Sequence, residues 1–150
     1  MKFMFDSMVY DKIAATQGMV ERLNHLSREG SVTVLSTHIQ EDELAKIPDG
    51  QKKDAVAKII TKKVATSGGV WGVSKWGRFT WGDGSSGGAA VDDIRSPSKK
   101  HTKDALIATT GAKDADVLVT DDRRLANRMK ALNSPCEIWG FDKLKKYIFQ

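Results

Sequence analysis

Cysteine, proline and long apolar runs are scarce in this sequence, and two of these scarcities exclude a class of protein. The 150 residues include one cysteine, Cys136, so a disulfide framework is excluded and we expect a reducing compartment. No segment approaches the roughly 20 apolar residues of a membrane-spanning helix. Asp6 and Asp11 interrupt the start "MKFMFDSMVYDKI", which therefore lacks the apolar run of a signal peptide. We therefore expect a soluble, cytoplasmic protein with no membrane partner.

Charge of one sign is in modest excess. Lys and Arg number 24 against 19 Asp and Glu, which gives a net charge of +5 and a pI of about 9.3. This bias is compatible with a polyanionic partner, although many basic proteins bind no nucleic acid. A hydrophobic content of 40% suits one core, so we predict a single domain over residues 1–150.

Short apolar runs alternate with segments of helical periodicity along most of the chain. We predict strands at residues 2–5, 31–37, 116–120 and 136–140, and helices after Asp6 up to Gly30, from about residue 40 to Pro48, and over 51–66, 102–112 and 123–132. Strands separated by helices imply right-handed crossovers and a parallel sheet. The predicted fold is a three-layer α/β/α sandwich with a central parallel sheet of four to five strands.

A segment rich in Trp, Gly and Ser breaks this alternation at about residues 67–100. It reads as a hairpin or loop, in which Trp71 and Val73 would share a face with Phe79 and Trp81 across a turn at 75–77. "DGSSGG" then reads as a flexible loop.

Two interpretations of the tryptophans in this insert stay open. Trp71, Trp76 and Trp81, interleaved with Lys75 and Arg78, could stack unpaired bases while the cations track a nucleic-acid backbone. Alternatively, the aromatic side chains pack on the domain or across a dimer interface, because large exposed aromatic surfaces usually find a protein partner.

Acidic residues recur where predicted strands give way to helices. They are Asp6, Glu41, Asp42, Glu43, Asp104, Asp121 and Asp122. In an open parallel sheet the carboxyl ends of the strands form the crevice where ligands bind. We therefore expect these side chains to converge at one edge of the sheet.

Carboxylates gathered in one cleft require a counter-charge. Two of them 4 Å apart repel by about 4 kcal/mol at an effective dielectric constant near 20. Hard oxygen ligands without a convincing His or Cys set favour Mg²⁺ or Mn²⁺ over Zn²⁺. Such ions activate water and stabilise a leaving oxygen, so the pattern predicts phosphodiester hydrolysis.

The chain resembles the PIN-domain nucleases in four stretches: "KFMFDSMVYDKI", "STHIQEDEL", "KDALIATTGAKDADVLVTDDRRL" and "CEIWGFDKL". The most specific part is the run D-x-x-I-x-x-x-x-x-x-x-A-x-x-L-V-T-x-D that ends at Asp122. The resemblance implies that Asp6, Glu43, Asp104 and Asp122 are the catalytic, metal-binding acids. It also implies that Thr120 orients a carboxylate or a metal-bound water.

Two of these assignments have alternatives. Glu43 lies at the family spacing from Thr37, but Glu41 could supply the carboxylate if the helix starts earlier. Asp122 fits the pattern Thr-x-Asp, whereas Asp121 could bind a second metal or cap the following helix.

Other residues have a structural reading beside the functional one. Any one acid at a helix start is explained by capping and the helix dipole alone. Arg123 and Arg124 could clamp phosphates or form a solvated helix face. His38 and His101 read as ordinary surface or strand-end residues, with a substrate contact for His101 as the alternative. Cys136 reads as a small buried hydrophobe.

The resemblance implies an Mg²⁺- or Mn²⁺-dependent endoribonuclease acting on RNA, with single-stranded RNA as the expected substrate. It further suggests the toxin of a VapC-type toxin–antitoxin pair, restrained by a small antitoxin in the acidic groove, and a homodimer of the kind the family often forms. The alternative is a non-catalytic PIN-like module that binds RNA or a protein and keeps the acids only as a cation site.

Overall fold

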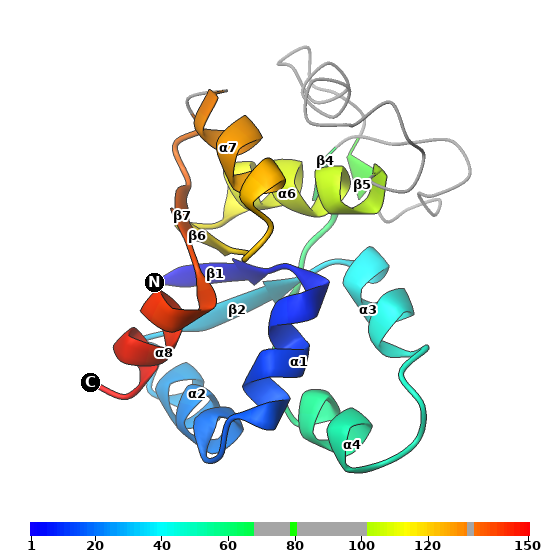
Figure 1. Cartoon of the computed structure of the whole chain (residues 1–150), viewed down its shortest axis with the longest axis vertical. Coiled ribbons are helices and arrows are strands. Elements are labelled where there is room, and N and C mark those ends of the chain that lie inside the picture. Colours follow the sequence, from blue (N-terminus) through cyan, green and yellow to red (C-terminus); the bar gives the residue numbers. More distant parts are fainter. Residues whose placement is uncertain (68–78, 81–101, 132–133) are drawn as a thin grey trace.

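A computed structural model describes residues 1–67, 79–80, 102–131 and 134–150; the side chains of 67, 79–80 and 102–105 are outside the description. The elements, in chain order, are β1 (Lys2–Phe5), α1 (Ser7–Ala15), α2 (Met19–Arg28), β2 (Thr33–Ser36), α3 (His38–Leu44), α4 (Gln51–Ala57), β3 (Lys62–Lys63), β4 (Thr66–Ser67), β5 (Phe79–Thr80), α6 (Thr102–Asp114), β6 (Val117–Val119), α7 (Arg123–Ala131), β7 (Glu137–Trp139) and α8 (Phe141–Ile148). Figure 1 shows their arrangement. Within these ranges, no helix combines the length and the apolar content that crossing a membrane requires.

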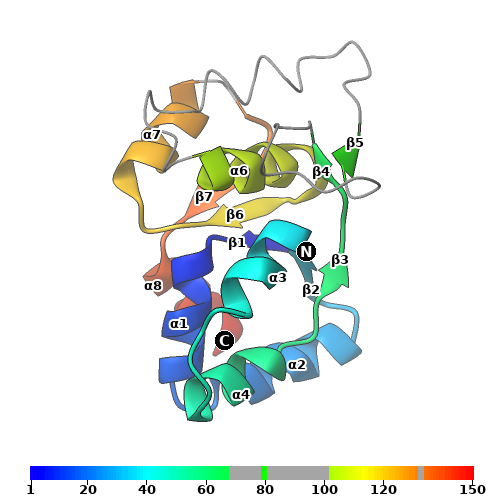
Figure 2. The same cartoon turned by 90° about the vertical axis from the view of Figure 1, so that its right-hand side faces the viewer.

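The central sheet has five parallel strands in the order β3-β2-β1-β6-β7. Figure 2 shows α6 and α7 on one side of it and α1, α2, α4 and α8 on the other, consistent with a three-layer sandwich. The predicted α/β fold with a parallel sheet is therefore confirmed. Because the strands are parallel, their carboxyl ends lie at one edge.

Alternation along the short strands divides the core between the two faces of the sheet. Phe3 and Phe5 of β1 point to the face covered by α1, α2 and α8, and Met4 points to the face covered by α6 and α7. All three side chains are fully buried. Burial of a large apolar side chain stabilises the fold by about 1.5–3 kcal/mol, so β1 anchors both halves of the core.

Helix α6 lies close against the sheet because a glycine faces it. A Cβ atom built on Gly111 would lie 3.4 Å from side-chain atoms of both Met4 and Leu118. The missing side chain lets the helix backbone approach β1 and β6. This contact fixes the height of α6 above the strands that carry the candidate site.

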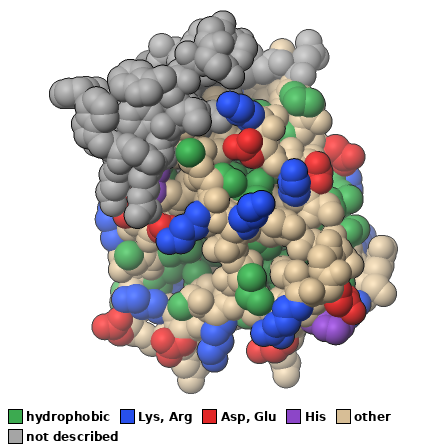
Figure 3. All heavy atoms as spheres, turned by 180° about the vertical axis from the view of Figure 1, so that it is seen from behind, with side chains coloured by type: hydrophobic (Ala, Val, Ile, Leu, Met, Phe, Trp, Pro, Cys, Tyr) green, Lys and Arg blue, Asp and Glu red, His purple; other side chains and the backbone are tan. Residues whose placement is uncertain are grey.

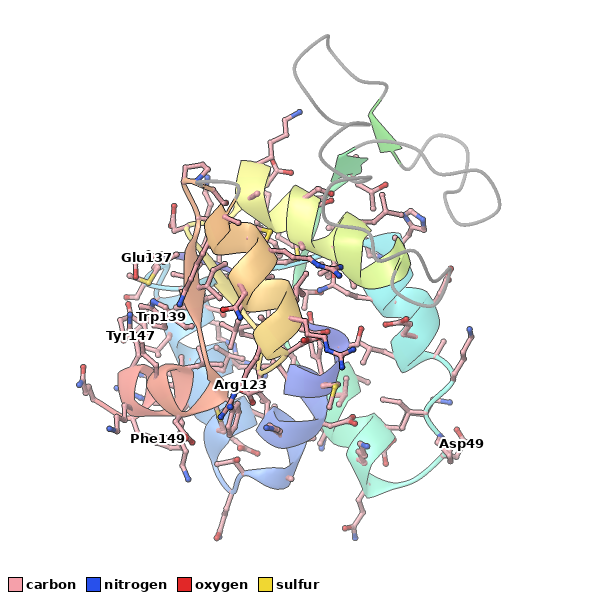
Figure 4. All side chains as sticks on the ribbon, turned by 45° about the horizontal axis from the view of Figure 1, so that its top comes forward. Asp49, Arg123, Glu137, Trp139, Tyr147 and Phe149 are labelled. Atoms are coloured by element: carbon pink, nitrogen blue, oxygen red, sulfur yellow. The ribbon has the colours of Figure 1, made fainter. Side chains whose placement is uncertain are left out.

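The edge strand β7 packs against α8 at one side of the core. Trp139 packs edge-on to Tyr147 of α8, with ring centroids 5.5 Å apart, and its Nε1 donates to Glu137 Oε2 at 2.7 Å. Lys143 lies over the same indole ring at 4.2 Å from its centroid. Figure 4 shows this group on the side of the molecule formed by β7 and α8.

Two predicted helices are wrong in extent. The segment up to Gly30 forms two helices, α1 and α2, because the chain turns at Gly18, whose φ of 73° is the left-handed conformation that favours glycine. The helix predicted over 51–66 ends at Ala57, and Lys62 and Lys63 then add β3 to the sheet by pairing with Leu35 and Ser36. Pairing with β2 outweighs the helical period of the sequence there.

The hairpin predicted near residues 71–81 lies mostly outside the described residues. Phe79 and Thr80 are described as β5, which pairs in parallel with β4 through Thr66 and Ser67. The segment 68–78, which includes Trp71, Val73 and Trp76, falls in the part that the structure does not describe.

Candidate functional site

Three of the four predicted acids lie at the carboxyl edge of the sheet. Asp6 directly follows β1, Asp122 lies three residues after the end of the adjacent strand β6, and Glu43 lies on α3, which follows β2. The Asp6 backbone N–H donates to Val119 O at 2.9 Å, which extends the β1–β6 pairing to this residue. Asp6 is 6% exposed, so the strand holds its carboxylate at a buried position.

Thr120 joins two of these acids through one hydroxyl group. Its Oγ1 donates to Asp6 Oδ2 at 2.7 Å and accepts a hydrogen bond from the Asp122 backbone N–H at 3.1 Å. The Thr120 side chain is buried. The hydroxyl group therefore fixes the orientation of the Asp6 carboxylate and the path of the chain into Asp122.

The electrostatic environment of Asp6 disfavours its charge. Burial raises the pKa of the Asp6 carboxyl above its ordinary value of 3.8, and the nearby Asp122 and Glu43 carboxylates raise it further. Hydrogen bonds from the Thr120 hydroxyl and the Ser7 N–H act in the opposite direction. The Asp122 and Glu43 carboxylates thus each lie close enough to Asp6 to disfavour its charged form.

Glu43, rather than Glu41, is directed toward Asp6. The hydroxyl group of Ser7, the residue after Asp6, donates to Glu43 Oε2. Glu41 instead forms an ion pair with Lys63 of β3 at 2.9 Å. The two acids lie two residues apart on a helix, so they point in different directions. Of the two acids, Glu43 is therefore the one whose charge acts on Asp6.

Asp122 caps the helix that it precedes. Its Oδ1 accepts from the backbone N–H groups of Arg124 at 2.8 Å and Leu125 at 3.2 Å, which places it at the N-cap of α7. The hydrogen bonds to Oδ1 hold the carboxyl group in a fixed orientation. Capping and the proximity to Asp6 are compatible, because a carboxylate has two oxygen atoms.

Asp121 is directed away from this group. Its Oδ2 contacts Lys12 Nζ at 2.5 Å, and its Oδ1 accepts from the Phe141 backbone N–H at 2.9 Å. Burial alone would raise the pKa of Asp121, but the hydrogen bonds from Lys12 and from the Phe141 N–H lower it below 3.8. The helix that Asp121 helps to cap is α8, not the α7 that immediately follows it.

The fourth predicted acid, Asp104, falls in the first turn of α6, and its side chain lies outside the described residues. Helix α6 packs against α3 and precedes β6, so its first turn lies toward the carboxyl edge (Figure 1). Within the described part of the chain, no three His, Cys, Asp or Glu side chains form a group that could hold a metal ion. The predicted quartet therefore depends on Asp104.

Of the predicted substrate-binding residues, two are described by the structure and the others are not. Arg123 and Arg124 are exposed at the start of α7, directly after Asp122, and Figure 4 shows Arg123 at the lower end of that helix. Predicted contacts that lie outside the described residues are Lys75, Trp76, Arg78 and His101.

Two other side chains singled out in the sequence are buried. His38 is 4% exposed at the first position of α3, so the surface alternative for it is wrong: α3 turns this side chain into the interior. Cys136 is also buried, as predicted, and burial raises the pKa of its thiol to about 11. A thiol with this pKa stays protonated near neutral pH and is a poor nucleophile.

Sequence reasoning missed three side chains that organise the site. Ser7 holds Glu43, Lys12 holds Asp121, and Gln40 is fully buried between α3 and β1. The spacing Thr37-x-x-Gln40 is that of a capping box, which could have singled out Gln40. Nothing in the local sequence pairs Lys12 with an acid 109 residues away.

A separate cavity of about 450 Å³ lies toward the amino ends of the strands, away from the acids. Its lining residues are Lys2, Thr33, Leu35, Lys62, Val64, Ala65, Lys113 and Asp114. Figure 3 shows Lys and Arg side chains distributed over the rear face of the molecule. None of the predicted catalytic acids lines this cavity.

The described acids at the carboxyl edge offer only oxygen donors, although among themselves they form no group that could hold a metal ion. Oxygen ligands suit Mg²⁺ or Mn²⁺ rather than Zn²⁺. The pKa of Asp6 is raised mainly by burial and to a smaller extent by the Asp122 and Glu43 carboxylates. Comparisons with family models, with curated proteins and with solved structures found no match.

Proposed function

We propose that this protein is a PIN-type endoribonuclease that hydrolyses RNA phosphodiester bonds with the help of Mg²⁺ or Mn²⁺. The observation that carries the proposal is the position of Asp6, Glu43 and Asp122 at the carboxyl edge of a parallel sheet. There the charges of Glu43 and Asp122 both raise the pKa of Asp6. Functional sites typically bring like charges together in positions where burial also disfavours the charged form.

Hydrogen bonds within the chain orient three of the carboxylates. Thr120 holds Asp6, Ser7 holds Glu43, and the first turn of α7 holds Asp122. Asp104 would complete the set from α6. A cation held by these groups would lower the pKa of an attacking water and stabilise the leaving oxygen. The protein residues would supply fixed oxygen ligands, so that little reorganisation is needed during the reaction.

The exposed guanidinium groups of Arg123 and Arg124 would receive RNA phosphates next to the acids. The net charge of +5 favours approach of a polyanion, and this attraction weakens as salt is added. RNA as the substrate, a small antitoxin partner and a homodimer follow from the resemblance to PIN-domain nucleases, and a cytoplasmic location follows from the single cysteine. All four form part of the proposal.

The deciding experiment measures cleavage of an end-labelled single-stranded RNA with Mn²⁺, with Mg²⁺ and with EDTA. We expect cleavage with either metal, none with EDTA, and loss of cleavage in Asp6→Asn and Asp122→Asn. Asp121→Asn is the matched control, because it removes the adjacent charge at a carboxylate directed toward Lys12. RNA binding without cleavage by the parent protein would contradict the proposal and favour a non-catalytic PIN-like module.

The toxin role has its own test. Expression of the parent protein should arrest growth of a bacterial host, whereas Asp6→Asn should not, and a small protein encoded next to it should restore growth and block RNA cleavage by the purified parent. Normal growth with an active parent enzyme would favour a housekeeping ribonuclease.

A further inference from the structure

The hydrogen-bond ladder between β1 and β2 stops one step before its regular end. Thr33 N donates to Met1 O at 2.9 Å, and the register pairs Lys2 with Thr33 and Met4 with Leu35. In a parallel ladder every second residue of one strand repeats this bond. The next donor beyond Leu35 would be Thr37 N, and its regular acceptor would be Phe5 O.

A side-chain carboxamide occupies the place of that bond. Thr37 N donates to Gln40 Oε1 at 2.6 Å, and Gln40 Nε2 donates to Phe5 O at 2.5 Å. The Gln40 side chain is fully buried, and its Nε2 also lies 3.4 Å from Met4 Sδ. One carboxamide therefore bridges the two backbone groups that would otherwise bond directly.

This insertion lies between the two acids from neighbouring strands. Phe5 O belongs to the residue before Asp6, and Thr37 is the N-cap of α3, the helix that carries Glu43. Because the Gln40 carboxamide takes both partners of the direct bond, the spacing of β1 and β2 at this edge depends on the Gln40 side chain. Figure 1 shows α1 and α3 leaving the sheet from the ends of these two strands.

We propose that Gln40 is a positioning residue whose carboxamide sets the spacing between Asp6 and Glu43 for a divalent cation. The inference rests on the proposed function for the identity of the ligand. The insertion of the Gln40 carboxamide between Thr37 N and Phe5 O, called the wedge below, concerns only this chain. Glutamine suits the position because it donates and accepts at once, whereas glutamate only accepts and methionine makes no comparable bond.

The chain offers a matched control in Asn24. Its Nδ2 donates to Lys58 O at 2.7 Å and its Oδ1 accepts from Ile60 N at 2.9 Å, so it is also a carboxamide that bridges a backbone carbonyl and a backbone N–H. It is 8% exposed and joins α2 to the segment after α4, away from the acids. Asn24→Leu should lose comparable hydrogen bonds without changing the site.

The first test needs no metal. In Gln40→Ala the smaller side chain leaves room for Thr37 N–H to bond Phe5 O directly, which appears as a through-hydrogen-bond NMR coupling between the Thr37 amide nitrogen and the Phe5 carbonyl carbon. We expect this coupling in Gln40→Ala and its absence in the parent and in Asn24→Leu. The same coupling in the parent, or none in a folded Gln40→Ala, would overturn the wedge.

The second test measures Mn²⁺ affinity by titration calorimetry on folded proteins. Groups that orient metal ligands typically change affinity by about 10–100-fold, so we expect Gln40→Met to bind Mn²⁺ at least about tenfold more weakly than the parent. Asn24→Leu should bind within about twofold of the parent. Equal affinities in Gln40→Met and the parent would refute the positioning role and leave the nuclease proposal intact. A parent that binds no Mn²⁺ would refute the metal-dependent function, while the coupling would still decide the wedge.

Discussion

Asp121 and Asp122 are adjacent on the chain but belong to two groups of residues with opposite electrostatics. In the acid cluster, defined by Asp6, Glu43 and Asp122, burial and mutual repulsion raise the pKa of Asp6. In the α8 tie, defined by Lys12, Asp121 and the Phe141 N–H, a cation and a helix start lower the pKa of Asp121. Adjacent residues of the β6–α7 connection thus belong to different electrostatic environments.

The difference separates a structural acid from a functional candidate. The α8 tie satisfies its carboxylate within the chain and joins α1, β6 and α8. Hydrogen bonds orient the carboxyl groups of the acid cluster, but the cluster brings like charges together. This costs stability unless a ligand compensates. Proteins retain such arrangements mainly where a ligand or a reaction uses them.

Removing one charge from each group should give the largest difference in RNA cleavage between variants. Asp6→Asn is expected to lower Mn²⁺-dependent RNA cleavage by at least about 100-fold, the range for a group acting at the reacting atoms. Asp121→Asn should keep cleavage within a few-fold of the parent. Initial rates on the same RNA measure both, and similar losses in the two variants would show that the groups are not functionally distinct.

Thr120→Val tests the hydroxyl group that connects Asp6 to Asp122. The variant keeps the shape but leaves the Asp122 N–H without its acceptor, so unfolding should require about 1–3 kcal/mol less free energy. Thr120→Ser retains the hydroxyl and should recover most of this loss. Urea unfolding measures both variants, and a Thr120→Val protein as stable as the parent would contradict the role assigned to this bond.

The two groups should also respond oppositely to pH. A raised pKa means that Asp6 contributes stability that is fully present below 3.8 and lost as pH rises through its native pKa. A lowered pKa means that Asp121 contributes stability that is present above 3.8 and lost as pH falls through its native pKa.

Urea unfolding in EDTA, from about pH 3 to about pH 7, measures this contrast. Relative to the parent, Asp6→Asn should gain stability as the pH rises above 3.8, and Asp121→Asn should lose it. Changes of the same sign in both variants would contradict the opposite pKa shifts.

The smallest expected effect tests how closely the α8 tie is packed. A Cβ atom on Gly140 would lie 3.2 Å from Asp121 Oδ1, and the glycine φ of −80° imposes no backbone strain on alanine. Gly140→Ala should therefore cost at most about 1 kcal/mol of stability. In an Asp121→Ala background the same change should cost nothing, and an equal cost in both backgrounds would place its cause elsewhere.

Local patterns in the sequence were sufficient to predict the parallel α/β fold. Alternation of β-branched and apolar residues depends on neighbours in the chain, and strands joined by helices leave few topologies. The same reasoning placed Asp6 and Asp122 after two of the strands, and the structure shows that these strands, β1 and β6, are neighbours. It overextended the helix at 51–66, because a two-residue edge strand at Lys62 and Lys63 has too short a pattern to compete with a helical period.

By itself, the sequence determined that acids follow the carboxyl ends of parallel strands. Only the tertiary structure decided which acid of each neighbouring set faces the others, since Glu41 pairs with Lys63 and Asp121 with Lys12. It also decided that the Gln40 carboxamide replaces a ladder bond. These choices depend on partners from other elements of the fold, and no local periodicity encodes contacts between segments so far apart in the chain.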